Sequence, residues 1–176
     1  MKRIRIIVAV MVTVFCMGCS MNLKDGVTYL EEGKYEEAVT AFKKAIEDEK
    51  YGEQAYRGVA IAYFEMGEYE QALEYFETAF SFKESGEDFE DTPSIYAMKA
   101  ACHLHLRELD EALALYQQAL EFECPEEMKQ EMLFNEIAIY QEFGEWEIVK
   151  EKVASYVENY PDDTRMDKTV EFLETR

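Results

Sequence analysis

The amino-acid sequence predicts an all-α fold built from a repeated pair of helices, and three observations support this prediction. Hydrophobic residues make up 48% of the chain and aromatic residues 14%, which is enough apolar material for a packed core. Only 8 Gly and 3 Pro occur in 176 residues, fewer turn-forming residues than an all-β sandwich requires. A pattern of aromatic, Gly and Ala residues also recurs at a near-constant spacing along the chain.

The charge of the chain argues against two kinds of partner. The sequence has 38 acidic residues and 18 basic ones, which gives a net charge of -20. Phosphate binding requires clustered Lys and Arg, so nucleic acid is not an expected partner. Adhesion to an anionic lipid surface through charge is not expected for the same reason.

The first element along the chain is a predicted signal peptide over residues 1–18. Lys2, Arg3 and Arg5 precede an uncharged apolar run over residues 6–17, which is the pattern of a secretory leader. The run has about 12 residues, whereas a membrane-spanning helix needs roughly 20, so a permanent transmembrane helix is not expected.

The apolar run ends in Gly18-Cys19, and a Gly directly before a Cys at this place resembles the lipobox of bacterial lipoproteins. Cys16 stands where that family usually has Leu. The resemblance implies that Cys19 becomes the first mature residue and carries a diacylglycerol, with acyl chains such as palmitate in the membrane. It also implies an extracytoplasmic protein, on the outer face of the plasma membrane or the periplasmic side. Ordinary secretion with cleavage nearby, or an uncleaved anchor, are the alternatives.

Two further cysteines remain after the leader. Cys102 and Cys124 occupy unlike positions of one repeat, so we expect free, mostly buried thiols rather than a disulfide, although the compartment is oxidising.

The rest of the chain contains four copies of one pattern. The third and fourth copies follow at slightly longer separations than the one between the first two, so insertions are expected before each of them. The matching positions are Tyr29, Gly33, Tyr35, Ala38, Phe42 and Ala45; Tyr63, Gly67, Tyr69, Ala72, Phe76 and Ala79; His103, Arg107, Leu109, Ala112, Tyr116 and Ala119; and Tyr140, Gly144, Trp146, Val149, Val153 and Tyr156.

The pattern Gly-x-Tyr-x-x-Ala-x-x-x-Phe-x-x-Ala is complete in the first two copies and resembles the tetratricopeptide repeat (TPR), a helix–turn–helix unit of about 34 residues. The resemblance covers residues 19–163. It implies a right-handed α-solenoid of about four TPR repeats, over about 19–52, 53–86, 93–126 and 130–163, followed by a capping helix over 164–176.

The residues explain the pattern physically. The recurring Gly ends the first helix in a left-handed conformation, and the recurring Ala lets two helices cross closely. We expect helix A of each pair over 21–31, 54–65, 94–105 and 128–142, and helix B over 35–47, 69–83, 109–122 and 146–159. Extra residues near 86–92 and 124–127 are expected to be loops. After Pro161, Asp162 and Asp163 can cap a last helix with one apolar stripe.

The sequence predicts no catalytic site, no metal site and no cofactor. His103 and His105 are two residues apart on a helix and therefore point to different sides, whereas a helical metal pair needs a spacing of three or four. No Gly-rich phosphate loop occurs. The acidic tract over 88–91 lacks the ligand spacing of a calcium loop and is expected to be a solvated loop.

The TPR resemblance implies a concave partner-binding groove lined by the helices A. Carried onto this sequence, the lining residues are Leu23, Val27 and Leu30; Arg57, Ile61 and Phe64; Ala97, Ala101 and Leu104; and Phe134, Ala138 and Gln141. The register points Phe64 into the groove and Tyr63 toward helix B. An apolar groove with an acidic rim suits an amphipathic, basic-flanked segment of a protein or peptide. The alternative is a tight superhelix in which these residues only touch their neighbours.

Three functions are consistent with the sequence. The first is a non-catalytic, lipid-anchored adaptor or scaffold that binds a protein partner at the bacterial cell envelope. The second is a structural accessory subunit of a stable envelope assembly or secretion complex, whose contacts lie on convex or end surfaces. The third is an enzyme of unrecognised type, which would need titratable residues around one deep pocket.

Overall fold

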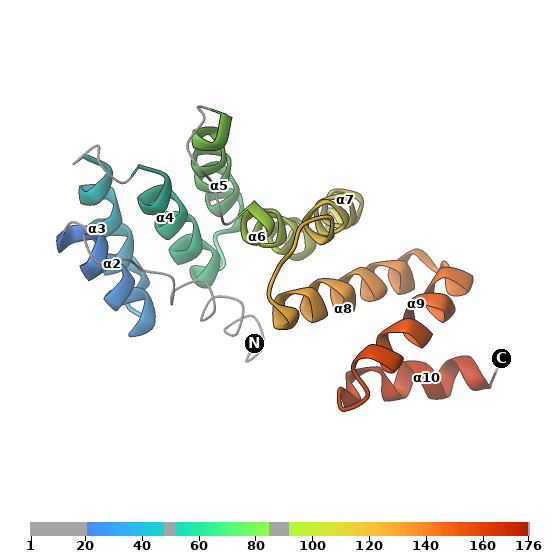
Figure 1. Cartoon of the computed structure of the whole chain (residues 1–176). Coiled ribbons are helices and arrows are strands. Elements are labelled where there is room, and N and C mark those ends of the chain that lie inside the picture. The colour runs from blue at the N-terminus through green and yellow to red at the C-terminus, as the bar shows by residue number, and fades with distance from the viewer. Residues whose placement is uncertain (1–20, 48–51, 85–91, 176) are drawn as a thin grey trace.

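The computed structural model describes residues 21–47, 52–84 and 92–175, and every regular element in these ranges is a helix. Figure 1 shows the helices following one another in chain order as a curved stack. The predicted leader, Cys19 and most of the predicted loop over 86–92 lie outside the described residues. The elements are α2 (Met21–Glu31), α3 (Tyr35–Glu47), α4 (Gly52–Met66), α5 (Tyr69–Glu84), α6 (Thr92–His105), α7 (Leu109–Leu120), α8 (Glu126–Phe143), α9 (Trp146–Asn159), the 3-10 helix η1 (Thr164–Met166) and α10 (Asp167–Glu174).

The eight paired helices predicted from the sequence are confirmed, so the chain is an all-α solenoid of four helix pairs. Helices α2, α3 and α9 have the predicted bounds, and the others differ by one or two residues at one or both ends. The last predicted helix is divided into η1 and α10. The division arises because the Asp163 carboxylate accepts a hydrogen bond from the Arg165 backbone N–H at 3.0 Å and holds the first turn.

The turns inside the pairs have the left-handed geometry that the recurring Gly predicts. Gly33, Gly67 and Gly144 have φ values of 72°, 82° and 74°, and Arg107 adopts the same conformation with φ 65° in the third pair. At each turn the residue after the left-handed one donates its backbone N–H five residues back, as Lys34 does to the Tyr29 carbonyl at 2.8 Å. The third pair therefore keeps the turn without Gly.

Close helix crossings in the first two pairs depend on Gly facing one aromatic ring. A Cβ atom on Gly26 would lie 2.7 Å from the Phe42 ring, and one on Gly58 would lie 2.5 Å from it. Phe42 of α3 is therefore enclosed by α2 on one side and α4 on the other. The same position in the third pair is Tyr116, whose buried hydroxyl accepts a hydrogen bond from Asn135 at 3.0 Å.

The C-terminal end of the stack is closed by α10 and by a polar cluster. The apolar stripe of Met166, Val170 and Leu173 packs against the core of the fourth pair, as predicted. The Arg165 guanidinium donates to Asp163 and, at 2.6 Å, to the Glu131 carboxylate. These bonds tie the residues after Pro161 back onto α8.

Candidate functional site

The structure divides the twelve predicted groove residues into two groups of six. Six are buried against neighbouring helices, and six are partly exposed. The buried residues are Leu23, Leu30, Ile61, Phe64, Ala97 and Ala101. The partly exposed residues are Val27, Arg57, Leu104, Phe134, Ala138 and Gln141. A buried side chain cannot contact a partner. The predicted groove is therefore limited to the six partly exposed residues, for which partner binding stays a prediction.

The expectation that Phe64 lies open to a partner is wrong for the free chain. Its side chain is only 4% exposed. Its ring packs edge-on against Tyr69, with centroids 5.5 Å apart, and against His105 at 5.7 Å. Phe64 thus joins the second pair to the third. Tyr63 packs against Tyr75 of helix B, as predicted, with ring centroids 5.4 Å apart, and is partly exposed.

The capping segment occupies the groove side of the fourth pair. The Arg165 guanidinium lies 4.2 Å from the centroid of the Phe134 ring, and Gln141 donates a hydrogen bond to Thr169 of α10 at 3.0 Å. Part of the predicted groove is therefore already covered by the chain itself.

The two His side chains contact different neighbours, as their spacing predicts. His103 Nδ1 lies 2.7 Å from the Glu108 carboxylate, and the His105 ring stacks on Tyr69 with centroids 4.4 Å apart. Burial lowers the pKa of His105, which favours the neutral imidazole. Among the residues that the structure describes, no group of three or more His, Cys, Asp or Glu is arranged to hold a metal ion.

Cys102 and Cys124 are free thiols, as predicted. Cys102 is buried, and burial raises the pKa of its thiol to about 12, which keeps it protonated and unreactive. Cys124 is half-buried, and burial raises its pKa as well.

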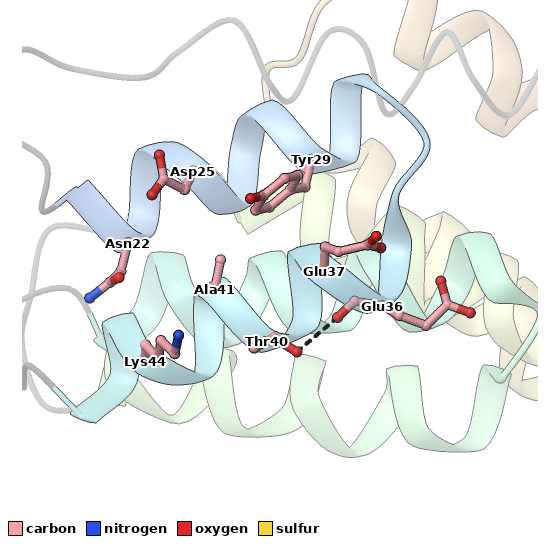
Figure 2. A pocket seen from close by; sticks show the side chains of 8 residues that line it. All are labelled: Asn22, Asp25, Tyr29, Glu36, Glu37, Thr40, Ala41 and Lys44. Carbon is pink, nitrogen blue, oxygen red and sulfur yellow. Dashed lines mark hydrogen bonds between the residues drawn. The ribbon is translucent and has the colours of Figure 1, made fainter.

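A hollow at the outer face of the first pair was not predicted. Its volume is about 310 Å³, and Figure 2 shows its lining side chains between α2 and α3. One feature of the sequence could have indicated this hollow. The small Ala41 occupies the position at which the second copy of the repeat has the much larger Tyr75. The lining residues are Asn22, Asp25, Tyr29, Glu36, Glu37, Thr40, Ala41 and Lys44.

None of the described helices is both long and apolar enough to cross a bilayer.

Two sequence profiles match the chain. One, described as a TPR repeat, covers residues 26–67, and the other, described as a tetratricopeptide repeat, covers residues 53–122. Together they span 26–122, which is more than half of the 176 residues. The chain belongs to the tetratricopeptide repeat family. A search of curated proteins gives no significant match.

Solved TPR structures share the fold of this TPR protein at low sequence identity. Pseudomonas aeruginosa pilF superposes with a TM-score of 0.67 at 19% identity over 84% of this chain, which spans 64% of that structure. YrrB, described as a TPR protein with an unusual peptide-binding site, gives 0.64 at 21% identity over 80% of this chain and 68% of YrrB. The first TPR domain of RPAP3, bound to an HSP90 peptide, gives 0.56 at 24% identity over 67% of this chain and 90% of that domain.

Proposed function

We propose that this TPR protein is a non-catalytic interaction module, anchored by lipid at Cys19 and facing away from the cytoplasm of a bacterium, where it binds a protein or peptide partner. The observation that carries the proposal is a stack of TPR pairs whose described part begins at Met21, two residues after a lipobox-like Gly18-Cys19. A lipid on Cys19 would hold the first pair close to the membrane.

The binding half of the proposal is supported by the fold and by its neighbours. TPR proteins mediate protein and peptide interactions, and two of the similar structures are described as peptide-bound or as having a peptide-binding site. The surface of this chain is strongly acidic, with a net charge of -20, so a basic partner segment is favoured over an acidic one.

The anchoring half is tested by substituting the acylated residue. Cys19→Ala should give a protein that is not processed or is released from the membrane, and it should no longer incorporate labelled fatty acid, because the acceptor thiol is gone. Cys124→Ala is the matched control, since Cys124 is a free, half-buried thiol and should leave labelling unchanged. Equal membrane retention and equal labelling of both variants would refute lipidation at Cys19.

The binding half is tested by affinity capture from detergent-solubilised membranes. Val27 is a partly exposed predicted groove residue, and Val27→Glu should reduce capture, because a partner would have to desolvate the new carboxylate. Val157→Glu on α9 is the matched control at a 37% exposed site. Circular dichroism of both variants checks that the fold is kept.

One observation favours the second candidate, a structural accessory subunit of a stable envelope complex. Half of the predicted groove residues are buried within the solenoid, which shifts the available surface to the ends and the convex side. Under this alternative, Val27→Glu leaves capture intact, and substitutions at an end of the stack abolish it.

A further inference from the structure

Neighbouring helix pairs meet at one recurrent position, here called the junction position. It contains a side chain from helix B of the preceding pair and one or more side chains of the following pair. At the first junction, Lys43 of α3 donates a hydrogen bond to the Tyr63 hydroxyl at 3.3 Å. Its ammonium lies 5.5 Å from the ring centroids of both Tyr63 and Tyr75, so the charge is placed over two aromatic rings.

The next two junctions use the equivalent residues of the later copies. Glu77 is the counterpart of Lys43 in the second copy of the repeat, and it pairs with the buried Lys99 at 2.5 Å. Gln117 is the counterpart in the third copy, and it donates to Glu136 at 3.2 Å and to the Tyr140 hydroxyl at 3.1 Å. Each preceding helix B therefore supplies one polar side chain to the pair that follows it.

The third junction also contains an ammonium group over a Tyr ring. Lys152 lies 2.8 Å from the Glu136 carboxylate and 5.5 Å from the ring centroid of Tyr140. Tyr140 is the counterpart of Tyr63 in the repeat. The first and third junctions thus place a Lys ammonium over the Tyr at the same repeat position. At the third junction, the Glu136 carboxylate, one helical turn before Tyr140, also binds the Lys.

The hollow of the first pair is the equivalent of the junction position, and within the described ranges no preceding helix B contributes a side chain to it. Tyr29 is the counterpart of Tyr63 and Tyr140, and Asp25 is the counterpart of Glu136. Both line the hollow, as Figure 2 shows for the outer face of α2. Asp25 is exposed, whereas Glu136 is buried beneath the preceding helix.

The charge in the hollow favours a cation. Three of its lining residues are carboxylates and one, Lys44, is an ammonium. Lys34 of the chain itself lies 5.8 Å from the centroid of the Tyr29 ring, but it does not line the hollow, and its ammonium is paired with Glu32 at 2.7 Å. The hollow therefore keeps an excess of negative charge beside an aromatic ring.

A closely stacked helix does not fit the outer face of α2. Lys24 stands where α4 has Gly58, the residue that lets Phe42 approach. Thr28 likewise stands where α4 has the fully buried Ala62. A further repeat or a second copy of this chain would meet the Lys24 side chain before it reached Tyr29, so an occupant must reach in with a long side chain.

We propose that the hollow between α2 and α3 binds the Lys side chain of a cationic segment of a partner protein, with the ammonium against the Tyr29 ring and the Asp25 carboxylate. The inference rests on the proposed function, because it names the surface at which this chain would bind its protein partner and the side chain of the partner that would be bound. The internal Lys43 and Lys152 contacts are the structural precedent for this arrangement.

In the test, a soluble peptide of alternating Ala and Lys is added in steps to the full chain in detergent micelles. Binding is measured from the NMR chemical shifts of the protein. Saturable shifts are expected for the residues that line the hollow, and the same peptide with every Lys acetylated should cause none. Asp25→Lys should weaken binding roughly tenfold by reversing one charge at the site. Tyr29→Leu should weaken it roughly two- to fivefold, since only the aromatic face is lost.

The matched control is Glu70→Lys, which makes the same charge change at the exposed counterpart of Glu36 on α5. It should change the affinity by less than about twofold, because surface charges outside the site are screened. Equal weakening by Glu70→Lys and Asp25→Lys would overturn the proposal in favour of unspecific attraction to an acidic surface. Binding of the acetylated peptide, or dimers of the chain that depend on Asp25, would also overturn it.

The same variants distinguish failure of the proposed Lys site from failure of the proposed function. If partner capture survives Asp25→Lys and is lost in Val27→Glu, the hollow is not the docking site and the proposed function stands. If the wild-type chain captures no partner while the peptide still fills the hollow, the proposed function fails and the binding chemistry stands.

Discussion

Phe64 is the residue at which the structure makes its sharpest stability prediction. The side chain is 4% exposed and packs between the second and third pairs, against Tyr69 and His105. Truncation of a buried Phe to Ala costs about 3–5 kcal/mol, because apolar contacts are lost and a cavity remains. A domain of this size is stable by about 5–15 kcal/mol, so Phe64→Ala should remove about a fifth or more of the total.

The assay is urea unfolding followed by far-UV circular dichroism, with Phe143→Ala as a matched control. Phe143 is 38% exposed, so the same truncation there should cost less than about 1.5 kcal/mol. The transition midpoint of Phe64→Ala should fall well below that of Phe143→Ala, with both variants folded in water. Equal losses would show that the Phe64 ring is not buried between the pairs, and the open groove predicted from the sequence would then be correct.

Three further outcomes follow from the packing and the charges. Ala72 is fully buried at a helix crossing, so Ala72→Leu should cost roughly 1–3 kcal/mol in urea unfolding, while Glu70→Leu on the exposed face should change stability by less than about 0.5 kcal/mol. Gly67 has a φ of 82°, so Gly67→Ala should cost about 1–2 kcal/mol of left-handed strain by the same measurement. Hydrogen bonds from Arg165 hold the pKa of Asp163 well below its usual value. The Asp163 carboxylate therefore stabilises the fold above about pH 4, and this stabilisation is lost as the pH falls further. The melting temperatures of wild type and Asp163→Asn should differ at neutral pH and converge in acid.

Helix positions could be predicted closely because their signals are local. The left-handed Gly, the small Ala at the crossing and the aromatic residue one turn later each act within one pair. Arg107 shows how strongly the surrounding pair determines the backbone, since it adopts a φ of 65° without the freedom of Gly. The last segment was less predictable, because the division between η1 and α10 depends on how Asp163 binds Arg165.

The groove was predicted less well because exposure depends on the distance between pairs. The TPR register predicts that Phe64 faces away from its own helix B, but its ring packs edge-on against Tyr69, the first residue of that helix. The register also does not show that His105 closes over Phe64, which depends on how the third pair sits on the second. The hollow in the first pair was missed because the repeat pattern does not include the position of Ala41, where the second copy has the larger Tyr75.

The two ends of the stack are finished in different ways, and the difference bears on where a partner can dock. At the C-terminal end, Met166 is buried and Arg165 is bonded to Glu131, so the end surface is occupied by the chain itself. At the first pair, the outer face of α2 carries Lys24, Asp25 and Thr28 where α4 carries Gly and apolar residues, so this face is more polar than its counterpart on α4. A polar face that contains a carboxylate-lined hollow beside Tyr29 is suited to reversible binding, because water can hydrate the charged side chains around the hollow again when the partner leaves.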